Sequence, residues 1–399
     1  MKKDKLDIYF KKLPKKVIFC KKCVMSNQRP RITFDKNGVC SSCNYLKYKN
    51  NYIDWNKRER ELKILANKIR KKNGDWDVLV PGSGGKDSSF VAHTLKFKYG
   101  LNPLCVTWAP FKYTDIGFKN FSEFTDSGFL TINCFGNGTI NRLLSRLCFE
   151  EIGDNFTPFT FGQHGFVYHI AEKFKINHIF FGEAADAEYG GKASKYEDNP
   201  SHRIAENSKL YWKGNNVRKL VKFGLKNKKY FEGFNPNHPD LNFYEPPKNI
   251  NPKIKMYHMS YFHYWRPQEN YYYASENTGF KPNPERSKGT YSKYASLDDK
   301  LDLLHYYMMF IKFGIGRATS DAAHEIREEL ILRDEAINLV EKYDGEFDIE
   351  DYRETLEYLS ISEGHFYKVL DSFRKKNIWK KENGKWKLRR TVGKNGTDD

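Results

Sequence analysis

The segment VLVPGSGGKDSSFVAHTL, from Val78 to Leu95, decides the fold. A short apolar run, a pair of glycines and an amphipathic pattern follow one another, which predicts a buried strand, a tight loop and a helix. Gly84 and Gly85 let the backbone turn tightly and approach a bound anion closely. The amides at the helix start, the ammonium group of Lys86 and the hydroxyls of the flanking serines all favour a phosphate. The segment therefore predicts a phosphate-binding loop.

Asp87 is the unexpected member of this loop. A phosphate repels a neighbouring carboxylate unless a cation lies between them, so we expect Asp87 to bind Mg²⁺. The pattern G-x-x-x-x-G-K-[ST], which defines the phosphate loop of kinases, does not occur at this place. The loop is therefore of a different kind.

The sequence on either side alternates between strand and helix patterns. Apolar runs predict strands over 76–81, 102–110, 128–135 and 178–183, and helical patterns cover 52–73, 87–99, 139–151 and 164–174. The first of these helices is expected to turn five apolar side chains inward: Trp55, Leu62, Ile64, Leu65 and Ile69. The aromatic segment MYHMSYFHYW, residues 256–265, predicts a further core strand rather than a histidine site. Such alternation is typical of an α/β fold with a doubly wound parallel sheet, which binds ligands at the carboxyl ends of its strands.

Four cysteines near the start form two Cys-x-x-Cys pairs, Cys20 with Cys23 and Cys40 with Cys43. Two such turns supply four thiolates to one tetrahedral ion, the arrangement of a structural zinc ribbon. The stretch between them predicts a hairpin that turns at Asn37-Gly38. Disulfides or free thiols are the alternative, but the basic N-terminus has no apolar stretch behind it and does not resemble a secretory signal.

The chain divides into three predicted parts: a zinc ribbon over 1–50, an α/β domain over 51–296 and a helical C-terminal region over 297–399. The alternation of strand and helix patterns stops over 188–256, where Gly, Asn, Pro and Lys predominate. This stretch predicts a partly helical or substrate-shaped insertion. A helix is expected from the cap at 319–321 to Gly345, and another after the cap Ser362. We also expect a hairpin over 378–388, followed by a disordered tail.

The formal charge of the 399 residues is +18, which fits either a nucleic-acid partner or a biased genome composition. The most basic segment, 209–229, holds eight Lys or Arg and no acid. It is either a solvated face or mobile insertion, or a surface that binds phosphates. No apolar cluster is long enough to span a bilayer. We expect a cytoplasmic protein for which nucleic acid is an unlikely partner.

The loop SGGKDS after a buried strand resembles the pyrophosphate-binding loop of the ATP-pyrophosphatase enzymes. This superfamily includes the GMP, NAD, argininosuccinate and asparagine synthetases and several tRNA-modifying enzymes. The resemblance implies a fold of that type. It also implies that ATP loses pyrophosphate and leaves AMP on an oxygen of the substrate.

Further segments are similar to the N-acetyl sugar amidotransferases, bacterial enzymes resembling the amidine-forming proteins of pseudaminic acid and O-antigen synthesis. These segments are TWAPFKYTDIGFKN (107–120), FGEAADAEYGG (181–191), ENTGFKPNPERSKGTYSKYASLDDK (276–300) and FGIGRATSDAAHEIR (313–327). The resemblance implies conversion of an acetamido group, on a free or nucleotide-linked sugar, into an acetamidino group. It implies ATP and Mg²⁺ as cofactors. A separate glutaminase would supply ammonia, since nothing in this chain looks like a glutaminase.

The resemblance also implies site residues. Those for ATP binding are Pro81, Ser83, Gly84, Gly85, Lys86, Asp87, Ser88, Thr107, Trp108 and Gly182. Those for catalysis are Lys86, Asp87, Glu183, Asp186 and Arg317.

Several of these roles have alternatives. Glu183, Asp186 and Glu188 are expected to bind Mg²⁺ or to orient the amide nitrogen and ammonia, unless they form only a solvated acidic turn. Arg317 would neutralise the leaving groups or serve a structural role. Two more basic residues, Arg286 and Lys288, are candidates for contacts with phosphates or a carboxylate of the substrate. Ala184 stands where the resemblance leads us to expect Asn, so that position carries no role.

Two other functions fit part of the pattern. A tRNA-modifying ATP-pyrophosphatase would share the loop, the ribbon and the basic charge. Thiolation generally needs a further cysteine pair near the loop, however, and Cys105, Cys134 and Cys148 are isolated in the sequence. A non-catalytic zinc-ribbon adaptor is the third alternative, which the intact SGGKDS disfavours.

Overall fold

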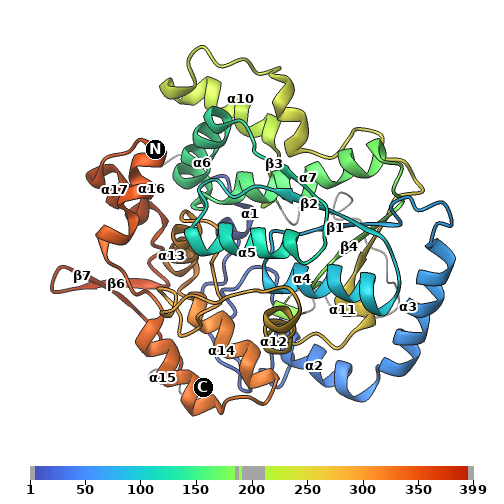
Figure 1. The fold of residues 1–399 in the computed structure, drawn as a ribbon. Coiled ribbons are helices and arrows are strands. Elements are labelled where there is room, and N and C mark those ends of the chain that lie inside the picture. Colours follow the sequence, from blue (N-terminus) through green and yellow to red (C-terminus); the bar gives the residue numbers. More distant parts are fainter. Residues whose placement is uncertain (1–4, 185–187, 191–211, 394–399) are drawn as a thin grey trace.

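The computed structural model describes residues 5–184, 188–190 and 212–393 (Figure 1). At its centre lies a five-stranded sheet in the order β3-β2-β1-β4-β5, in which every neighbouring pair is parallel. The strands are β1 (Val78–Pro81), β2 (Pro103–Trp108), β3 (Thr131–Cys134), β4 (His178–Phe181) and β5 (Lys255–His258). The predicted α/β fold with a parallel sheet is confirmed. The strand order reverses at β1, which places a ligand crevice at the carboxyl ends of β1, β2 and β4.

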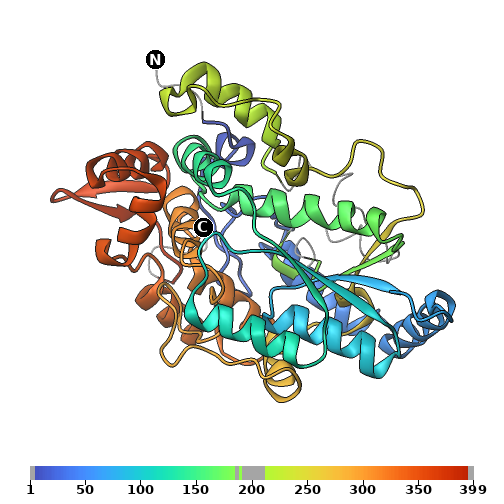
Figure 2. The ribbon, with the colours of Figure 1, turned by 45° about the horizontal axis from the view of Figure 1, so that its top comes forward.

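Alternate residues of the strands point to opposite faces of the sheet and build two separate cores. Leu79 and Ile179 pack with α6 and α7, whereas Val78 and Phe180 pack with α3, α4 and α5. These helices cover both faces of the sheet (Figures 1 and 2). Their bounds are α3 (Trp55–Ile69), α4 (Lys86–His93), α5 (Asp115–Asp126), α6 (Gly138–Ile152) and α7 (Thr157–Lys173). Strands that are apolar on both faces are what such coverage requires.

Some predicted boundaries in this domain are wrong. The helix predicted from 164 begins at Thr157, with Pro158 in its first turn, where a missing N–H costs little. Ile64 is 69% exposed rather than inward, because α3 covers the sheet along the stripe of Leu62 and Ala66. The segment 256–265 is a strand only as far as His258 and then forms the short helix α11 (Met259–Phe262). After α4 the chain continues as a π-helical turn η1 (Thr94–Lys98).

The single helix predicted between 319 and 345 is two helices, α14 (Arg317–Arg327) and α15 (Arg333–Tyr343). The break between them includes Glu329, whose φ of 61° is left-handed. α14 also starts before the predicted cap. Its first amides are satisfied by the Asp344 carboxylate, which accepts from the amides of Gly316 (2.8 Å) and Thr319 (3.1 Å).

The C-terminal helices share a core with the N-terminal segment: Phe10 and Val17 pack together with Leu304 and Phe366. The predicted cap of α17 is confirmed, since the Ser362 hydroxyl accepts from the amide of His365. The predicted hairpin is confirmed as the pair β6 and β7. The remaining elements are α1 (Ile8–Lys11), α2 (Ser41–Asn51), α12 (Pro267–Asn277), α13 (Asp302–Phe313), α16 (Arg353–Leu359), α17 (Glu363–Phe373), β6 (Trp379–Glu382), β7 (Lys385–Leu388) and the 3₁₀ turns η4 (Lys229–Phe231), η5 (Pro239–Tyr244) and η6 (Ile349–Tyr352). The three domain boundaries stay predictions.

The predicted insertion and the basic segment 209–229 lie partly outside the described residues. The described part holds α10 (Val217–Asn227), whose Val217, Leu220 and Val221 are buried in the core that α6 lines. Lys222 and Lys226 of the same helix are exposed. This arrangement favours the solvated-face interpretation for the part of the basic segment that forms α10. Among the described residues, no helix is both long enough and apolar enough to cross a bilayer.

A buried ion pair connects the N-terminal segment to α13. Asp7 Oδ2 lies 2.5 Å from Lys312 Nζ, with both side chains at most 2% exposed, and Lys312 also donates to the Ile152 carbonyl. We predict that Asp7→Ala lowers the free energy of unfolding by about 3–5 kcal/mol, because the buried ammonium loses its carboxylate.

Urea denaturation measures this change. The double variant Asp7→Leu/Lys312→Met is the control and should regain most of the loss, because an apolar pair carries no desolvation cost. Equal stability of Asp7→Ala and the unaltered chain would contradict the prediction.

Candidate active site

A cavity of about 520 Å³ opens at the carboxyl ends of β1, β2 and β4. Its wall includes the loop after β1, the start of α4, the residues after β4, a segment before α13 and the first residue of α14. The predicted site residues that line it are Pro81, Ser83, Gly85, Lys86, Asp87, Ser88, Thr107, Trp108, Gly182, Glu183 and Arg317. The structure thus brings together most residues selected from four distant parts of the sequence.

The loop between β1 and α4 is held in place by backbone contacts. The amide of Gly82 donates to the Val106 carbonyl on β2 (2.9 Å), and the Thr107 hydroxyl donates to the Gly82 carbonyl. Gly84 has a φ of +80°, and a Cβ there would lie 2.7 Å from the backbone oxygen of Asn120 on α5. Only glycine fits this position, because both the φ angle and the close approach exclude a side chain.

Asp87 is oriented by two partners. Its Oδ2 lies 2.5 Å from Lys86 Nζ, and its Oδ1 accepts from Asn270 Nδ2 at 3.0 Å. Asn270 is a buried residue of α12. Sequence reasoning missed it, because an Asn inside an aromatic helix carries no signal of its own.

Glu183 follows β4 directly and lines the same cavity as Asp87. Burial raises the pKa of its carboxyl to about 7, with further contributions from the nearby charges of Asp87 and Glu188 and an opposing one from Lys86. The Tyr189 hydroxyl donates to Glu183 Oε2 at 3.2 Å. Carboxylate oxygens are the ligands that Mg²⁺ prefers, and Asp87 and Glu183 are two carboxylates that line this one cavity.

Arg317 is the first residue of α14 and lines the cavity. It donates to Asp321 Oδ1 at 3.0 Å and lies 4.4 Å from the centre of the Tyr306 ring. These contacts fix its direction and leave it in the wall of the cavity. Arg317 and Lys86 are the two cations of the lining within the described residues.

The segment before α13 contributes carboxylates that sequence reasoning missed. The Ser83 hydroxyl donates to Asp298 Oδ2 at 2.5 Å, and burial raises the pKa of Asp298 to about 6. Asp299 accepts from the amides of Phe111 (2.5 Å) and Leu301 (2.9 Å). The acidic pair in SLDDK was the available signal, since it lies inside one of the motif segments.

Other predicted residues lie elsewhere. Glu188 is buried 3.1 Å from Lys49; Arg286 makes a 2.6 Å ion pair with Glu346; and Lys288 lies 3.4 Å from Asp351. None of Glu188, Arg286 and Lys288 lines the cavity within the described part of the chain. Asp186 lies outside the described residues.

Two residues predicted to contact ATP, Trp108 and Gly182, are packed against aromatic side chains. The Trp108 ring is buried in the core, 5.0 Å from the Tyr244 ring. It is packed so closely that a Cβ on Gly162 would overlap it. Any contact of Trp108 with adenine is therefore limited to its backbone and ring edge. Gly182 has a packing role, because a Cβ there would lie 2.9 Å from the Trp265 ring.

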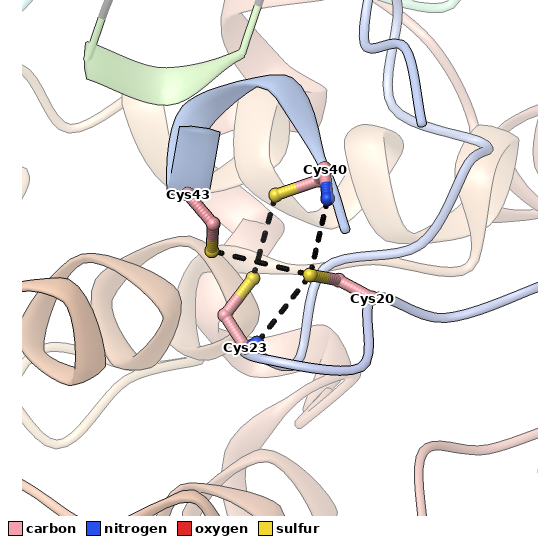
Figure 3. Close-up of side chains that lie close together, drawn as sticks. All are labelled: Cys20, Cys23, Cys40 and Cys43. Atoms are coloured by element: carbon pink, nitrogen blue, oxygen red, sulfur yellow. Dashed lines mark hydrogen bonds between the residues drawn. The ribbon is translucent and has the colours of Figure 1, made fainter. Parts of the chain in front are cut away.

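The four cysteines of the ribbon converge on one point (Figure 3). Their sulfurs lie within 4.8 Å of one another, with Cys20 to Cys43 at 3.9 Å and Cys23 to Cys40 at 3.7 Å. A tetrahedral ion with ligand bonds of about 2.3 Å separates its sulfurs by about 3.8 Å. The amides of Lys22 and Cys40 also donate to Cys20 Sγ. The spacing fits a structural metal such as zinc and not disulfides, whose sulfurs lie at about 2.05 Å.

Comparison with known proteins finds a similarity to a domain of lipopolysaccharide biosynthesis. Residues 288–392, about a quarter of the chain, match the family model "LPS biosynthesis protein WbpG-like, C-terminal domain". This match supports a sugar-modifying enzyme of lipopolysaccharide synthesis. A second similarity, 33% identity over 89 residues, is to the uncharacterized protein MJ1599 of Methanocaldococcus jannaschii. That match covers 22% of this chain and 31% of the relative's length.

The geometry of the loop predicts the effect of Gly84→Ala. The new methyl group would meet the backbone of α5 at a φ that alanine rarely adopts, so the loop must move. We expect ATP affinity, measured by calorimetry, to fall at least about tenfold, with secondary structure retained. Gly138→Ala is the matched control, because a Cβ there meets nothing within 4 Å. Unchanged ATP affinity in Gly84→Ala would show that the loop does not hold the nucleotide.

The cysteine cluster makes a prediction about metal content. We expect elemental analysis of the purified chain to find zinc in stoichiometric amount, and Cys23→Ser to lose it together with thermal stability. Cys134→Ser is the control and should keep the metal, since Cys134 lies on β3, outside the cluster. A metal-free but equally stable Cys23→Ser protein would contradict a structural role for the ion.

Proposed function

We propose that the protein is an ATP-dependent amidotransferase that converts an acetamido group of a bacterial surface sugar, free or nucleotide-activated, into an acetamidino group. The observation that carries the proposal is the convergence of Lys86, Asp87, Glu183 and Arg317 in one cavity at the strand ends. The match of residues 288–392 to a domain of lipopolysaccharide biosynthesis supports a sugar as acceptor. Resemblance of SGGKDS to the pyrophosphate loop supports ATP as the activating substrate.

The proposed reaction has two steps, adenylation of the acetamide oxygen and displacement of AMP by ammonia. The acetamide oxygen attacks the α-phosphorus of ATP, pyrophosphate leaves, and the amide N–H loses its proton, which gives an O-adenylyl imidate. Ammonia then adds to the imidate carbon, and AMP leaves with the former amide oxygen. Activation is needed because amide resonance, reflected in a rotation barrier of about 18–20 kcal/mol, makes the carbonyl a poor electrophile.

The chain's own residues suit these steps. The loop amides and Lys86 would bind the β and γ phosphates, and Arg317 would compensate charge on the departing groups. Glu183, with a pKa near neutrality, suits proton transfer from the attacking nitrogen. Mg²⁺ held by Asp87 would neutralise the phosphate charge.

Water must be kept away from the activated acetamide, since hydrolysis would return the starting amide. The lining includes five phenylalanines: Phe156, Phe159, Phe166, Phe181 and Phe280. Their rings contribute apolar surface to the cavity, which favours neutral ammonia over water and ammonium. A glutaminase partner that delivers ammonia is part of the proposal.

The tRNA-thiolating alternative is less well supported. Burial raises the pKa values of Cys105 and Cys134, and neither they nor Cys148 line the cavity. A thiol carrier or nucleophile needs access to the adenylate, which these positions do not give.

The test is pyrophosphate release from ATP and Mg²⁺ with ammonium, over a panel of N-acetylated sugars and sugar nucleotides. Product masses are read in the same reactions. We expect stoichiometric pyrophosphate and a product lighter than the acceptor by the difference between oxygen and NH. Asp87→Asn should lower kcat/KM at least about a thousandfold, because the metal and the loop lysine both lose their charge partner.

Asp126→Asn is the matched control. Asp126 is an exposed carboxylate at the end of α5, and we expect its variant to keep full activity. Stimulation of pyrophosphate release by bulk tRNA, with no sugar acting as acceptor, would replace this proposal with the tRNA-modifying one.

A further inference from the structure

A second cavity, of about 250 Å³, lies between the N-terminal segment, the zinc ribbon, the end of α6 and α13. Its lining contains four cationic side chains: Arg29, Arg31, Lys213 and Lys312. Two carboxylates, Asp7 and Asp154, and His305 belong to the same lining. Of these residues only Lys213 lies in a segment that the sequence analysis singled out, the basic segment 209–229.

Both carboxylates of this cavity form ion pairs with its lysines. Asp7 pairs with Lys312 at 2.5 Å. Asp154 contacts Lys213 and also accepts from His305 Nδ1, at 2.8 Å. The burial of these pairs leaves no acidic group of the lining for the arginines.

Among the described residues, Arg29 has no counter-charge. No ion pair or hydrogen bond joins its guanidinium to any residue in the described part of the chain, and its Nε is buried without a partner. Burial, together with repulsion by Arg31 and Arg327, lowers the pKa of Arg29 to about 10. A half-buried guanidinium that has lost part of its hydration and has no partner is costly, so an arginine at this position implies an anion that it binds.

The second cavity adjoins the candidate active site. The Arg29 guanidinium lies 5.7 Å from the centre of the Tyr189 ring, and the Tyr189 hydroxyl donates to Glu183. On α13, His305 lines the second cavity while its neighbour Tyr306 lines the active site. The two cavities are therefore neighbours, with Tyr189 and the side chains of α13 between them.

We propose that the second cavity binds an anionic group of the acceptor, phosphoryl or carboxylate, with Arg29 as its principal ligand. The identity of the ligand as the acceptor rests on the proposed function, whereas the anion site itself does not. A planar guanidinium binds either group through two parallel hydrogen bonds. The cavity is smaller than the roughly 300–1,000 Å³ typical of whole-ligand pockets, which suits one charged end of a larger molecule.

The test measures anion binding directly, by calorimetry with three probes: UDP for the phosphoryl source, D-glucuronate for the carboxylate source and neutral N-acetylglucosamine as reference. We expect UDP or glucuronate to bind, and Arg29→Met to weaken that binding at least about tenfold, the value of one charge-assisted pair. Arg29→Gln, which keeps the polar character, should do the same. The probe that binds identifies the source of the charge.

Two controls separate this site from the phosphate loop. Lys86→Ala should leave the binding of the probe within about twofold of the unaltered chain, whereas Arg29→Met should not. The reverse pattern, or binding that survives in both arginine variants, would overturn the proposal. Because no turnover is measured, failure of the proposed chemistry and failure of this site give different results.

A stability measurement supplies a second readout. Arg29→Met should raise the melting temperature of the anion-free chain, because it removes an uncompensated buried charge. Arg286→Met is the matched control and should lower it, because Arg286 makes a two-point ion pair with Glu346. A drop in melting temperature for Arg29→Met as large as that for Arg286→Met would show that Arg29 has a structural role instead. Where turnover is measured, Arg29→Met should raise KM for the acceptor and leave KM for ATP unchanged.

Discussion

Asp87 and Glu183 are two carboxylates that meet in one cavity, and much of the surrounding structure compensates for their repulsion. Parallel strands end at a common edge of the sheet, which brings the residues after β1 and β4 together. Lys86 forms an ion pair with Asp87, and Asn270 donates a hydrogen bond to it. Tyr189 donates a hydrogen bond to Glu183. Arg317, on α14, adds a positive charge to the lining of the cavity. Burial, with a smaller contribution from the charge of Asp87, raises the pKa of Glu183 to about 7, which gives the group a proton affinity useful near neutral pH. The same repulsion would draw a divalent cation into the site.

The zinc ribbon belongs to this arrangement through Glu188. The Glu188 carboxylate accepts from Lys49 on α2, the helix that starts after the ligand Cys40. Its carbonyl oxygen accepts from Arg327, near the end of α14. The ribbon, the turn at 188–190 and α14 are thereby one packed unit, and α14 carries Arg317. Glu188 therefore connects the cysteine cluster, through α2, to the helix that carries Arg317.

The sequence predicted the sheet, the loop and the cysteine cluster because each depends on a local pattern. Val78–Pro81 is apolar on both faces, and the glycines and paired cysteines have few alternative structures. The pattern did not reveal Asn270, Asp298 or Tyr189, whose roles arise only when distant segments meet. It also misplaced Ile64 and merged α14 with α15, since helical periodicity does not show which face has a partner or where a left-handed residue such as Glu329 breaks the helix. Arg286 and Glu188 show the opposite error, because charged residues inside a motif segment can be structural.

The two cavities differ in the sign of their excess charge, and this difference favours one orientation of a substrate. Within the described residues, five carboxylates but only two lysine or arginine side chains line the active-site cavity, whereas four lysine or arginine side chains and two carboxylates line the second cavity. An anionic acceptor is repelled from the acid-rich side wherever Mg²⁺ and the loop do not screen it, and is attracted to the side of Arg29. Its neutral acetamide can then approach Glu183 without bringing further negative charge. The desolvation of Arg29 would in this way contribute to orientation, since the cost of burying an unpaired cation is recovered only when the charged end of the substrate is in place.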